Sequence, residues 1–359
     1  MTNNNAHPTQ PSWMIYGANG YTGELIAREA VRRGQRPILA GRSLEKIQPL
    51  ANELGLEARA FTLNDTHHAA GQIQGCHLLL NCAGPFSATA EPMINACLQA
   101  KAHYLDITGE IAVFELAQSL NKQAERAGIV VCPGVGFDVI PTDCVAAALK
   151  QAMPDATHLT LGFDTRSGFS PGTAKTSVEG MAQGGKVRRN GVITSVPLAY
   201  KVRRIDFGDG EKTAMTIPWG DVSTAYHTTG IANIEVFLPG SPALIAGAKR
   251  ANYIRPLLGI RWVQNLIKAR IGKSVKGPNE NKRASMPTYV WGEVSNARGE
   301  RKTARIRTAN GYSLTITGSL TVVDYLLTNQ PAAGTYTPAG LLGPELVSRL
   351  PESGTLQIS

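Results

Sequence analysis

Three glycines lie at intervals of three residues directly after a short apolar segment, Trp13–Tyr16. Gly17 can make a tight turn, Gly20 has no side chain to hold the backbone away from a pyrophosphate, and Gly23 lets a following helix pack closely. The amides at the start of that helix, Glu24–Arg33, would bind phosphate oxygens. The spacing and its context predict a dinucleotide-binding loop; the alternative is a glycine-rich strand-to-helix turn that binds nothing. The residues that we expect to line the loop are Gly17, Asn19, Gly20, Tyr21, Thr22 and Gly23.

The end of the second expected strand indicates which dinucleotide fits. An NAD-binding protein usually carries Asp or Glu about twenty residues after the glycine loop, where the carboxylate bonds the ribose 2′-hydroxyl. Here Gly41, Arg42 and Ser43 follow the strand, without a carboxylate. Arg42 can donate two N–H groups to a 2′-phosphate and stack on adenine, while Ser43 adds a hydroxyl donor. The sequence therefore predicts NADP(H) in preference to NAD(H), unless Arg42 is only a solvated arginine at a helix start.

Two further strand ends would face the same cleft. The apolar segment His77–Cys82 is followed by small and turn-forming residues, which we expect to flank the diphosphate and the ribose. Asp65 follows the third expected strand and could meet the edge of the adenine, although an ordinary turn aspartate is an equal alternative. The residues predicted to bind cofactor after the fourth strand are Ala83, Gly84, Pro85 and Phe86.

A hydride-transfer reaction also needs a proton source, and the ends of strands supply such groups. Asp106 ends the fifth expected strand, Asp138 follows a glycine turn after the sixth, and Lys175 lies at the start of an expected helix. We select these three as catalytic candidates. The alternatives are helix capping or loop fixing for the two aspartates and a surface position for the lysine. Tyr226 and His227 are placed at the end of an expected strand, where a structural role is the default.

Short apolar segments, which we expect to be strands, alternate with helical segments in the first 143 residues. This order predicts a doubly wound parallel sheet. The expected helices are 24–33, 44–54, 92–101 and 112–127. The expected strands are 13–16, 36–40, 58–63, 77–82, 103–107 and 129–132.

The pattern changes near residue 154. From there on, apolar and polar residues alternate along most of the expected strands, which predicts a mostly antiparallel sheet with one face in water. Helical segments interrupt this sheet at about 173–183 and 241–271, and helix returns at 320–329 and 338–349. The fold class is therefore α/β for the N-terminal domain, followed by an α+β domain. The expected strands of the second domain are 158–164, 201–207, 213–218, 232–238, 288–294, 301–308 and 312–318.

Composition limits the partners and the location. The chain has 359 residues and a formal net charge of +9, but aromatic residues make up only 6%, and none interleave with Lys and Arg as in a single-strand binder, so we expect no nucleic acid. Five cysteines without a C-x-x-C pair and a polar N-terminus are typical of a cytoplasmic protein. No metal-ligand or acyl-enzyme pattern is present, so no metal is expected.

The segment 243–276 mixes eight cations with apolar residues. A basic amphipathic helix can lie on anionic lipid or contact an acidic acyl carrier protein. The alternative, which we favour, is a helix packed on the second sheet with a solvated basic rim.

Five segments together resemble the saccharopine dehydrogenase-like oxidoreductases, a family that includes the trans-acting enoyl reductases. They are GANGYTG, LAGR, NCAGPF, YLDITGE and CPGVGFDVIPTD. The resemblance covers Trp13 to about Asp143 and extends weakly to the closing segment 336–343. It implies cofactor binding by Gly17, Gly20, Gly23, Arg42, Gly84 and Pro85.

The resemblance also implies that the last helices return to the Rossmann domain. We therefore expect a cofactor domain over 12–143, joined by 311–359, and an inserted substrate and dimerisation domain over 144–310. The resemblance does not decide the reaction. Together with the glycine loop and Arg42 it favours an NADPH-dependent reductase of a C=C or C=N bond in a small-molecule or acyl-type substrate, and a homodimer is a further expectation. The alternative is a non-catalytic NADP(H)-binding scaffold or redox sensor that docks on membrane or an acidic partner through 243–276.

Overall fold

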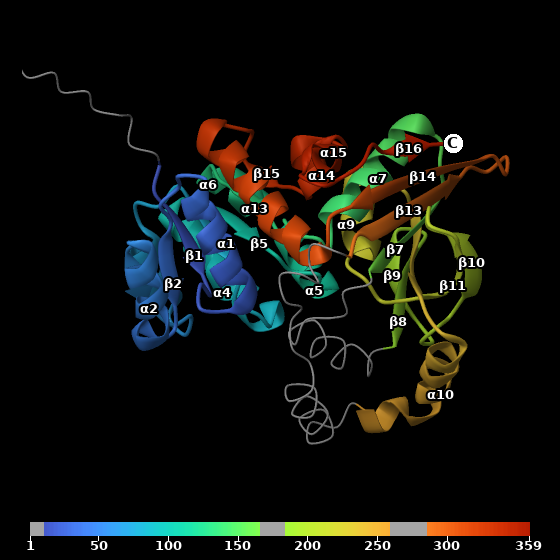
Figure 1. Cartoon of the computed structure of the whole chain (residues 1–359), viewed down its shortest axis with the longest axis horizontal. Helices are drawn as coiled ribbons and strands as arrows, with labels where there is room; N and C mark the ends of the chain where they lie inside the picture. The colour runs from blue at the N-terminus through green and yellow to red at the C-terminus, as the bar shows by residue number, and fades with distance from the viewer. Residues whose placement is uncertain (1–10, 166–183, 259–285) are drawn as a thin grey trace, which may run out of the picture. The chain divides into compact units, whose positions relative to one another are not determined.

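The computed structural model describes residues 11–165, 184–258 and 286–359 (Figure 1). These residues form two compact units. One contains the described residues through Ile107, together with Ala117–Cys132 and Ser319–Thr335. The other contains Thr108–Leu116, the described part of Pro133–Gly318, and Tyr336–Ser359.

The first unit is built on a seven-stranded sheet in the order β15-β6-β5-β4-β1-β2-β3, in which every pair of neighbours is parallel. Strands β1 and β4 are buried along their whole length, as expected for strands covered on both faces. The predicted parallel sheet is confirmed. Its strands are β1 Trp13–Tyr16, β2 Ile38–Gly41, β3 Ala58–Ala60, β4 Leu78–Asn81, β5 His103–Asp106, β6 Val130–Cys132 and β15 Gly334–Thr335.

Helices connect these strands, and α1 and α2 lie beside β1 and β2 (Figure 1). Helix α2 has the predicted bounds because Ile47, Leu50 and Ala51 form one buried face, and Gly55 ends it in the left-handed conformation. The expected single helix 112–127 is two helices with a break at Leu120. The helices are α1 Tyr21–Arg32, α2 Leu44–Leu54, α3 Thr66–Ile73, α4 Phe86–Ala100, α5 Ile111–Ser119 and α6 Asn121–Ala127.

The carboxyl ends of the central strands lie in one row. Tyr16 of β1 is in register with Ala40 of β2 and with Asn81 of β4, and Asn81 is in register with Asp106 of β5. The glycine loop and the segments after β2 and β4 therefore leave the sheet at the same edge, which is where ligands bind in open α/β sheets.

A segment from late in the chain completes the first unit. Gly334 of β15 pairs with Val130 of β6, and the imidazole of His77 is 2.9 Å from the carbonyl oxygen of Leu326. The unit boundaries nevertheless differ from the expected ones, 12–143 with 311–359. Residues 108–116, 133–143, 311–318 and 336–359 join the second unit. Of these, α7 packs on its sheet and β16 pairs with it.

The second unit contains a nine-stranded sheet whose main path is β10-β11-β12-β7-β13-β14-β16, with the hairpin β8–β9 joined at β12. Among the described strands of this sheet only the β12–β7 pair is parallel, so the predicted mostly antiparallel sheet is confirmed. The strands are β7 His158–Thr165, β8 Gly185–Arg189, β9 Val192–Val196, β10 Val202–Asp206, β11 Glu211–Thr216, β12 Asn233–Pro239, β13 Thr288–Ser295, β14 Arg301–Thr308 and β16 Gln357–Ile358.

Helix α7 packs on one face of this sheet. Its Val145 and Leu149 share a buried cluster with Leu161 and Val290. A Cβ at Gly292 of β13 would lie 2.6 Å from Val145 Cγ1, so the close approach of helix and strand requires glycine there. The other helices are α7 Ile140–Ala152, α9 Asp221–Thr229, α10 Pro242–Leu258, α13 Gly311–Thr328, α14 Pro338–Leu342 and α15 Leu346–Arg349.

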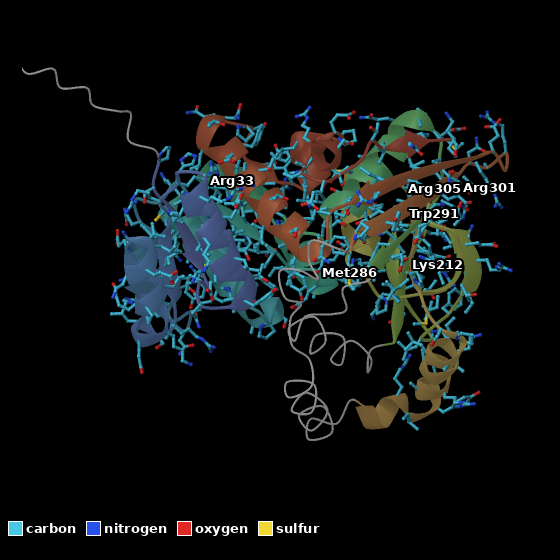
Figure 2. All side chains as sticks on the ribbon, viewed as in Figure 1. Arg33, Lys212, Met286, Trp291, Arg301 and Arg305 are labelled. Carbon is cyan, nitrogen blue, oxygen red and sulfur yellow. The ribbon has the colours of Figure 1, made fainter. Side chains whose placement is uncertain are left out.

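The opposite face of the second sheet carries aromatic rings beneath cations. The guanidinium of Arg203 lies 5.2 Å from the ring centroid of Trp291, and Lys212 lies 6.0 Å from that of Tyr289. Figure 2 labels Lys212, Trp291 and Arg305 on this sheet. Arg203 and Lys212 are also paired with acids, Glu293 and Asp164, so their charges are largely neutralised.

Two expected elements are wrong. The segment 312–318, expected as a strand, forms the first turns of α13, and 226–227 lie within α9 and not at a strand end. In α13 the hydroxyls of Thr315 and Thr317 donate back to the carbonyls four residues earlier, and Leu314 is fully buried. Burial and these local bonds override the strand preference of β-branched residues. The expected helix 173–183 and most of 259–271 lie outside the described residues.

Among the residues that the model describes, no helix is both long and apolar enough to cross a membrane. The cytoplasmic location stays a prediction.

Candidate functional site

The glycine loop joins β1 to α1 through a compact turn. The amides of Gly17 and Ala18 both donate to the carbonyl of Ala40, at 2.8 and 3.1 Å, and the amide of Gly20 donates to the carbonyl of Gly17 at 3.0 Å. Gly17 has a φ of +83°, and a Cβ there would lie 2.8 Å from the amide nitrogen of Ala83. Only glycine fits this position without strain.

The other two glycines have different surroundings. A Cβ at Gly23 would lie 2.4 Å from the carbonyl oxygen of Gly17, so this glycine sets how closely α1 approaches the loop. At Gly20 the only neighbour within 4 Å of an added Cβ is the carbonyl oxygen of Gly17, at 3.2 Å. The outer side of Gly20 is therefore open, and no side-chain cap covers the start of α1. This cradle fits a pyrophosphate that approaches the backbone.

The segment after β2 presents a free cation. Arg42 is exposed, and its guanidinium makes no hydrogen bond or ion pair with any residue that the model describes. Ser43 precedes α2, but its hydroxyl does not cap that helix. The nearest carboxylate along the chain, Glu45, lies in the first turn of α2. Arg42 and Ser43 together are the donor set that a 2′-phosphate requires.

The segment after β4 is held by a buried amide. Asn81 Oδ1 accepts from the amide of Ala83 at 3.0 Å, and Asn81 Nδ2 donates to Thr89 Oγ1 at 3.2 Å. Thr89 in turn donates to the carbonyl of Ala83 at 2.7 Å. Gly84 and Pro85 are consequently exposed on a fixed turn before α4, which begins at Phe86. The sequence contained Asn81 but gave no sign of this fixing role.

Two acidic candidates of the first unit have structural partners. Asp65 is the N-cap of α3, and its carboxylate accepts from the amides of His67 and His68 at 2.9 and 3.1 Å. Asp106 is fully buried and accepts from the hydroxyl of Tyr104 at 2.7 Å. Asp65 therefore does the capping work of an ordinary turn aspartate, and Asp106 has no exposed surface through which to reach a substrate.

Asp138 is placed differently. It lies in the loop between β6 and α7 in the second unit and is partly exposed. Its carboxyl group makes no hydrogen bond or ion pair with the described residues, and a Cβ at Gly109 would come within 3.0 Å of its Oδ2. Burial in these surroundings raises the pKa of Asp138 to about 7. A carboxyl group in this range can hold and release a proton at neutral pH.

Two neighbouring acids are fully buried. Asp143 accepts from the hydroxyl of Thr228 and from the amide of Ala339, the latter at 2.8 Å, and burial raises its pKa to about 6. Neither carboxylate oxygen of Asp221 is hydrogen-bonded to a residue that the model describes, and burial raises the pKa of Asp221 well above the usual value. The sequence analysis did not select Asp221, because no motif surrounds it.

Tyr226 and His227 belong to a charged cluster on α9. Glu115 Oε1 accepts from Ser223 at 2.6 Å and from Arg188 at 2.7 Å, and it lies 3.6 Å from His227 Nε2. Bonding to His227 and to these donors lowers the pKa of Glu115 to about 2. The guanidinium of Arg188 lies 4.1 Å from the ring centroid of Tyr226. The two residues therefore have structural partners.

Lys175, the third catalytic candidate, lies outside the described residues. Within the described part of the chain, no group of three or more His, Cys, Asp or Glu side chains is placed to hold a metal ion.

The strand order and the glycine loop define a Rossmann dinucleotide-binding domain. Residues 13–132 match the family model described as "Saccharopine dehydrogenase NADP binding domain". Residues 13–132 are therefore similar to that family's NADP-binding domain, and the resemblance found in the sequence is confirmed over them. The domain therefore binds a nucleotide cofactor.

Two curated relatives are similar over part of the chain. The saccharopine dehydrogenase-like oxidoreductase of Homo sapiens is 28% identical over 202 residues, which are 49% of this chain and 47% of that protein. A candidate trans-acting enoyl reductase of Mycobacterium tuberculosis is 30% identical over 193 residues, which are 48% of this chain and 45% of that protein. The chain spans about half the length of the curated relatives that it matches.

The apo saccharopine dehydrogenase (L-Glu forming) of Saccharomyces cerevisiae has a similar structure. The alignment covers 97% of this chain and 100% of that chain, with a TM-score of 0.66 and 11% sequence identity. At this identity the match shows that the two chains share a fold, including the second domain.

Proposed function

We propose that the protein is an NADP(H)-dependent oxidoreductase of the saccharopine dehydrogenase-like type, which reduces a C=C or C=N bond. The observation that carries the preference for NADP(H) is the unpaired guanidinium of Arg42 beside Ser43. A 2′-phosphate would replace water around this guanidinium with charge-assisted hydrogen bonds. The names of the relatives, oxidoreductase and enoyl reductase, support the reaction class.

Calorimetric titration of NADPH and NADH tests this preference. We expect Arg42→Ala to weaken NADPH binding about 10- to 100-fold, which corresponds to about 1.5–3 kcal/mol for charge-assisted bonds, with little effect on NADH. Arg126→Ala is the matched control, because Arg126 is an exposed arginine in the last turn of α6, away from the glycine loop along the chain. Equal affinity of the wild-type protein for both nucleotides would contradict the preference.

The reaction itself is tested by loss of NADPH absorbance with two sets of substrates, trans-enoyl thioesters and preformed imines. Turnover with either set supports the reductase. Tight NADPH binding without turnover on both sets supports the non-catalytic alternative instead.

A second candidate function, docking on a surface, is supported by the exposed residues of α10. Leu244, Tyr253 and Ile254 are 53, 88 and 51% exposed, and Lys249 and Arg250 lie on the same helix. Another side of α10 packs on the second unit, since Ile245 contacts the cluster of Ala199 and Met215. Co-sedimentation with phosphatidylserine vesicles tests this docking. Binding that persists in Tyr253→Ser, or that does not weaken with salt, argues against it.

A further inference from the structure

One edge of β12 in the second unit is shared by two hairpins. Ile234 near the start of β12 pairs with β8 of the hairpin β8–β9, and Phe237 pairs with β11 of the hairpin β10–β11. The other edge of β12 is occupied by β7. A cleft of about 670 Å³ is lined by residues of β8 and β10, together with residues of β7 and β12. Its volume is in the range of small-molecule sites.

Cations outnumber acids around this cleft. The lining residues that the structure describes include four cations and one acid, namely Arg188, Arg189, Lys201, Arg203 and Glu235. Two further acids pair with two of the cations, since Glu115 lies 2.7 Å from Arg188 and Glu293 lies 3.1 Å from Arg203. Four cations against three acids leave a net positive charge, which favours an anionic ligand.

Arg188 fixes β8 and directs its charge away from the cleft. Its guanidinium donates to the carbonyls of Val222 and Gly191 at 2.6 Å each and to Glu115 Oε1 at 2.7 Å. Only 4% of this side chain is exposed. Neighbouring side chains of a strand point to opposite faces, so Arg189 points away from α9 and is exposed beside the cleft.

The ring of Tyr200 brings two cations together. The guanidinium carbon of Arg189 lies 5.0 Å from the ring centroid, and Arg189 donates to the Tyr200 hydroxyl. The ammonium nitrogen of Lys201 lies 5.8 Å from the same centroid. Glu235 accepts from this ammonium at 2.5 Å, which uses one of its three N–H donors. The partner of Arg189 is a neutral hydroxyl, so Arg189 retains its charge.

The arrangement of these donors suits a phosphate group. Arg189 lies on β8 and Lys201 directly precedes β10, so the two cations approach from different segments of the chain. A tetrahedral phosphate monoester presents three oxygens in different directions and carries up to two negative charges, whereas a carboxylate presents two oxygens in one plane. The rest of the cleft, which extends to Phe237, has room for an organic group.

We propose that this cleft binds a small phosphate monoester, and that Arg189 and Lys201 hold its phosphate group. All the residues that line the cleft belong to the second unit, whereas the glycine loop belongs to the first. The proposal therefore adds a second anion site to the chain and does not depend on which nucleotide the first unit prefers.

Labelling of arginines with phenylglyoxal, read by peptide mass spectrometry, tests the site at Arg189 itself, so phosphate bound elsewhere does not affect the result. Saturating glycerol 2-phosphate should slow the labelling of Arg189 about tenfold, because charge-assisted bonds would cover its guanidinium. Arg204 is the matched control, because it lies on β10, is 70% exposed and pairs with Glu211 outside the cleft lining. Sodium chloride at the same ionic strength should protect neither arginine. Absent protection of Arg189, or equal protection of Arg189 and Arg204, overturns the site.

Lys201→Gln tests the second cation with the same labelling. The variant should need about tenfold more glycerol 2-phosphate for half-maximal protection of Arg189, as expected for the loss of one charge-assisted bond. Lys186→Gln is the matched control, because Lys186 lies on β8 and donates to Ser195 outside the cleft lining. Unchanged protection in Lys201→Gln overturns the pairing of Arg189 with Lys201. Stronger protection by malonate than by glycerol 2-phosphate overturns the phosphate class.

Discussion

The indole N–H of Trp219 donates a hydrogen bond of 3.0 Å to the main-chain carbonyl of Asp138, which ties the loop before α7 to the segment before α9. Trp219→Phe would keep an aromatic ring against Phe163 but remove the donor. We expect the free energy of unfolding to fall by about 1–3 kcal/mol, because the carbonyl loses its partner. Urea denaturation measures this loss.

Trp13→Phe is the control for this prediction. Trp13 is buried, at 2% exposure, whereas Trp219 is partly buried, and the Nε1 of Trp13 has no hydrogen-bond partner among the residues that the model describes. Both substitutions remove the same atoms, whereas only Trp219→Phe breaks a bond. Equal losses from the two variants would show that lost volume, and not the bond to Asp138, accounts for the effect.

Asp221 should be more stable as an amide at neutral pH. Within the described part of the chain neither of its oxygens has a hydrogen-bond partner, and burial raises the pKa of Asp221 well above the usual value. The unfolded chain releases this proton above about pH 4, whereas the folded protein retains it, so Asp221 destabilises the fold increasingly as pH rises. Asp221→Asn should therefore match the wild type near about pH 4 and exceed its stability by about 1–3 kcal/mol at neutral pH.

Thermal unfolding at acidic and neutral pH measures this difference. Asp143→Asn is the contrasting variant, because the two oxygens of Asp143 accept from Thr228 and Ala339, and the amide nitrogen that replaces one oxygen cannot accept its bond. It should destabilise the protein at neutral pH. If Asp221→Asn also destabilises the protein at neutral pH, the inference that Asp221 is protonated in the folded protein is wrong.

Local patterns predicted the cofactor half of the molecule. The periodicity of Ile47 and Leu50 defined α2, and the spacing of Gly17, Gly20 and Gly23 placed the loop where the structure has it. These features depend on neighbours within one turn or one strand, so the sequence contains them directly. The position of Arg42 directly after β2 was predicted in the same way, and its role in binding cofactor stays a prediction.

The rest depends on contacts between distant residues. Arg188 and Glu115 are 73 positions apart, and Asp143 bonds an amide 196 positions later. No motif surrounds Asp221 in the sequence. Its raised pKa arises from burial at the start of α9, which the sequence does not reveal. The strand expected at 312–318 failed for the same reason, since its helical form is fixed by burial against the second unit's core.

His103 should make the first unit sensitive to acid. Burial, and then the charge of His77, lowers the pKa of His103 to about 4, and its Nδ1 accepts from the amide of Val130 at 2.8 Å. The folded state therefore keeps His103 neutral while the unfolded chain binds a proton near pH 6.5. The stabilisation from keeping His103 neutral is complete above about pH 6.5 and is lost as pH falls toward 4, and the whole shift corresponds to about 3 kcal/mol.

His103→Asn tests that prediction, because asparagine offers an acceptor near the position of Nδ1 but does not titrate. The variant should lose less stability than the wild type between about pH 6.5 and 4. Urea denaturation across this range gives the two slopes. Parallel slopes would assign the acid sensitivity to other groups.

Gly23→Ala should separate the glycine loop from α1. An added Cβ would lie 2.4 Å from the carbonyl oxygen of Gly17, a backbone atom that cannot move without displacing the loop. We expect a loss of about 1–3 kcal/mol in the free energy of unfolding from overpacking and at least a tenfold weaker affinity for NADPH.

Gly71→Ala is the matched control, because Gly71 lies inside α3 with nothing within 4 Å of an added Cβ. The control should gain about 0.5–1 kcal/mol from helix propensity. Unchanged NADPH affinity in Gly23→Ala would mean that the close packing of α1 on the loop is not needed to hold the phosphates.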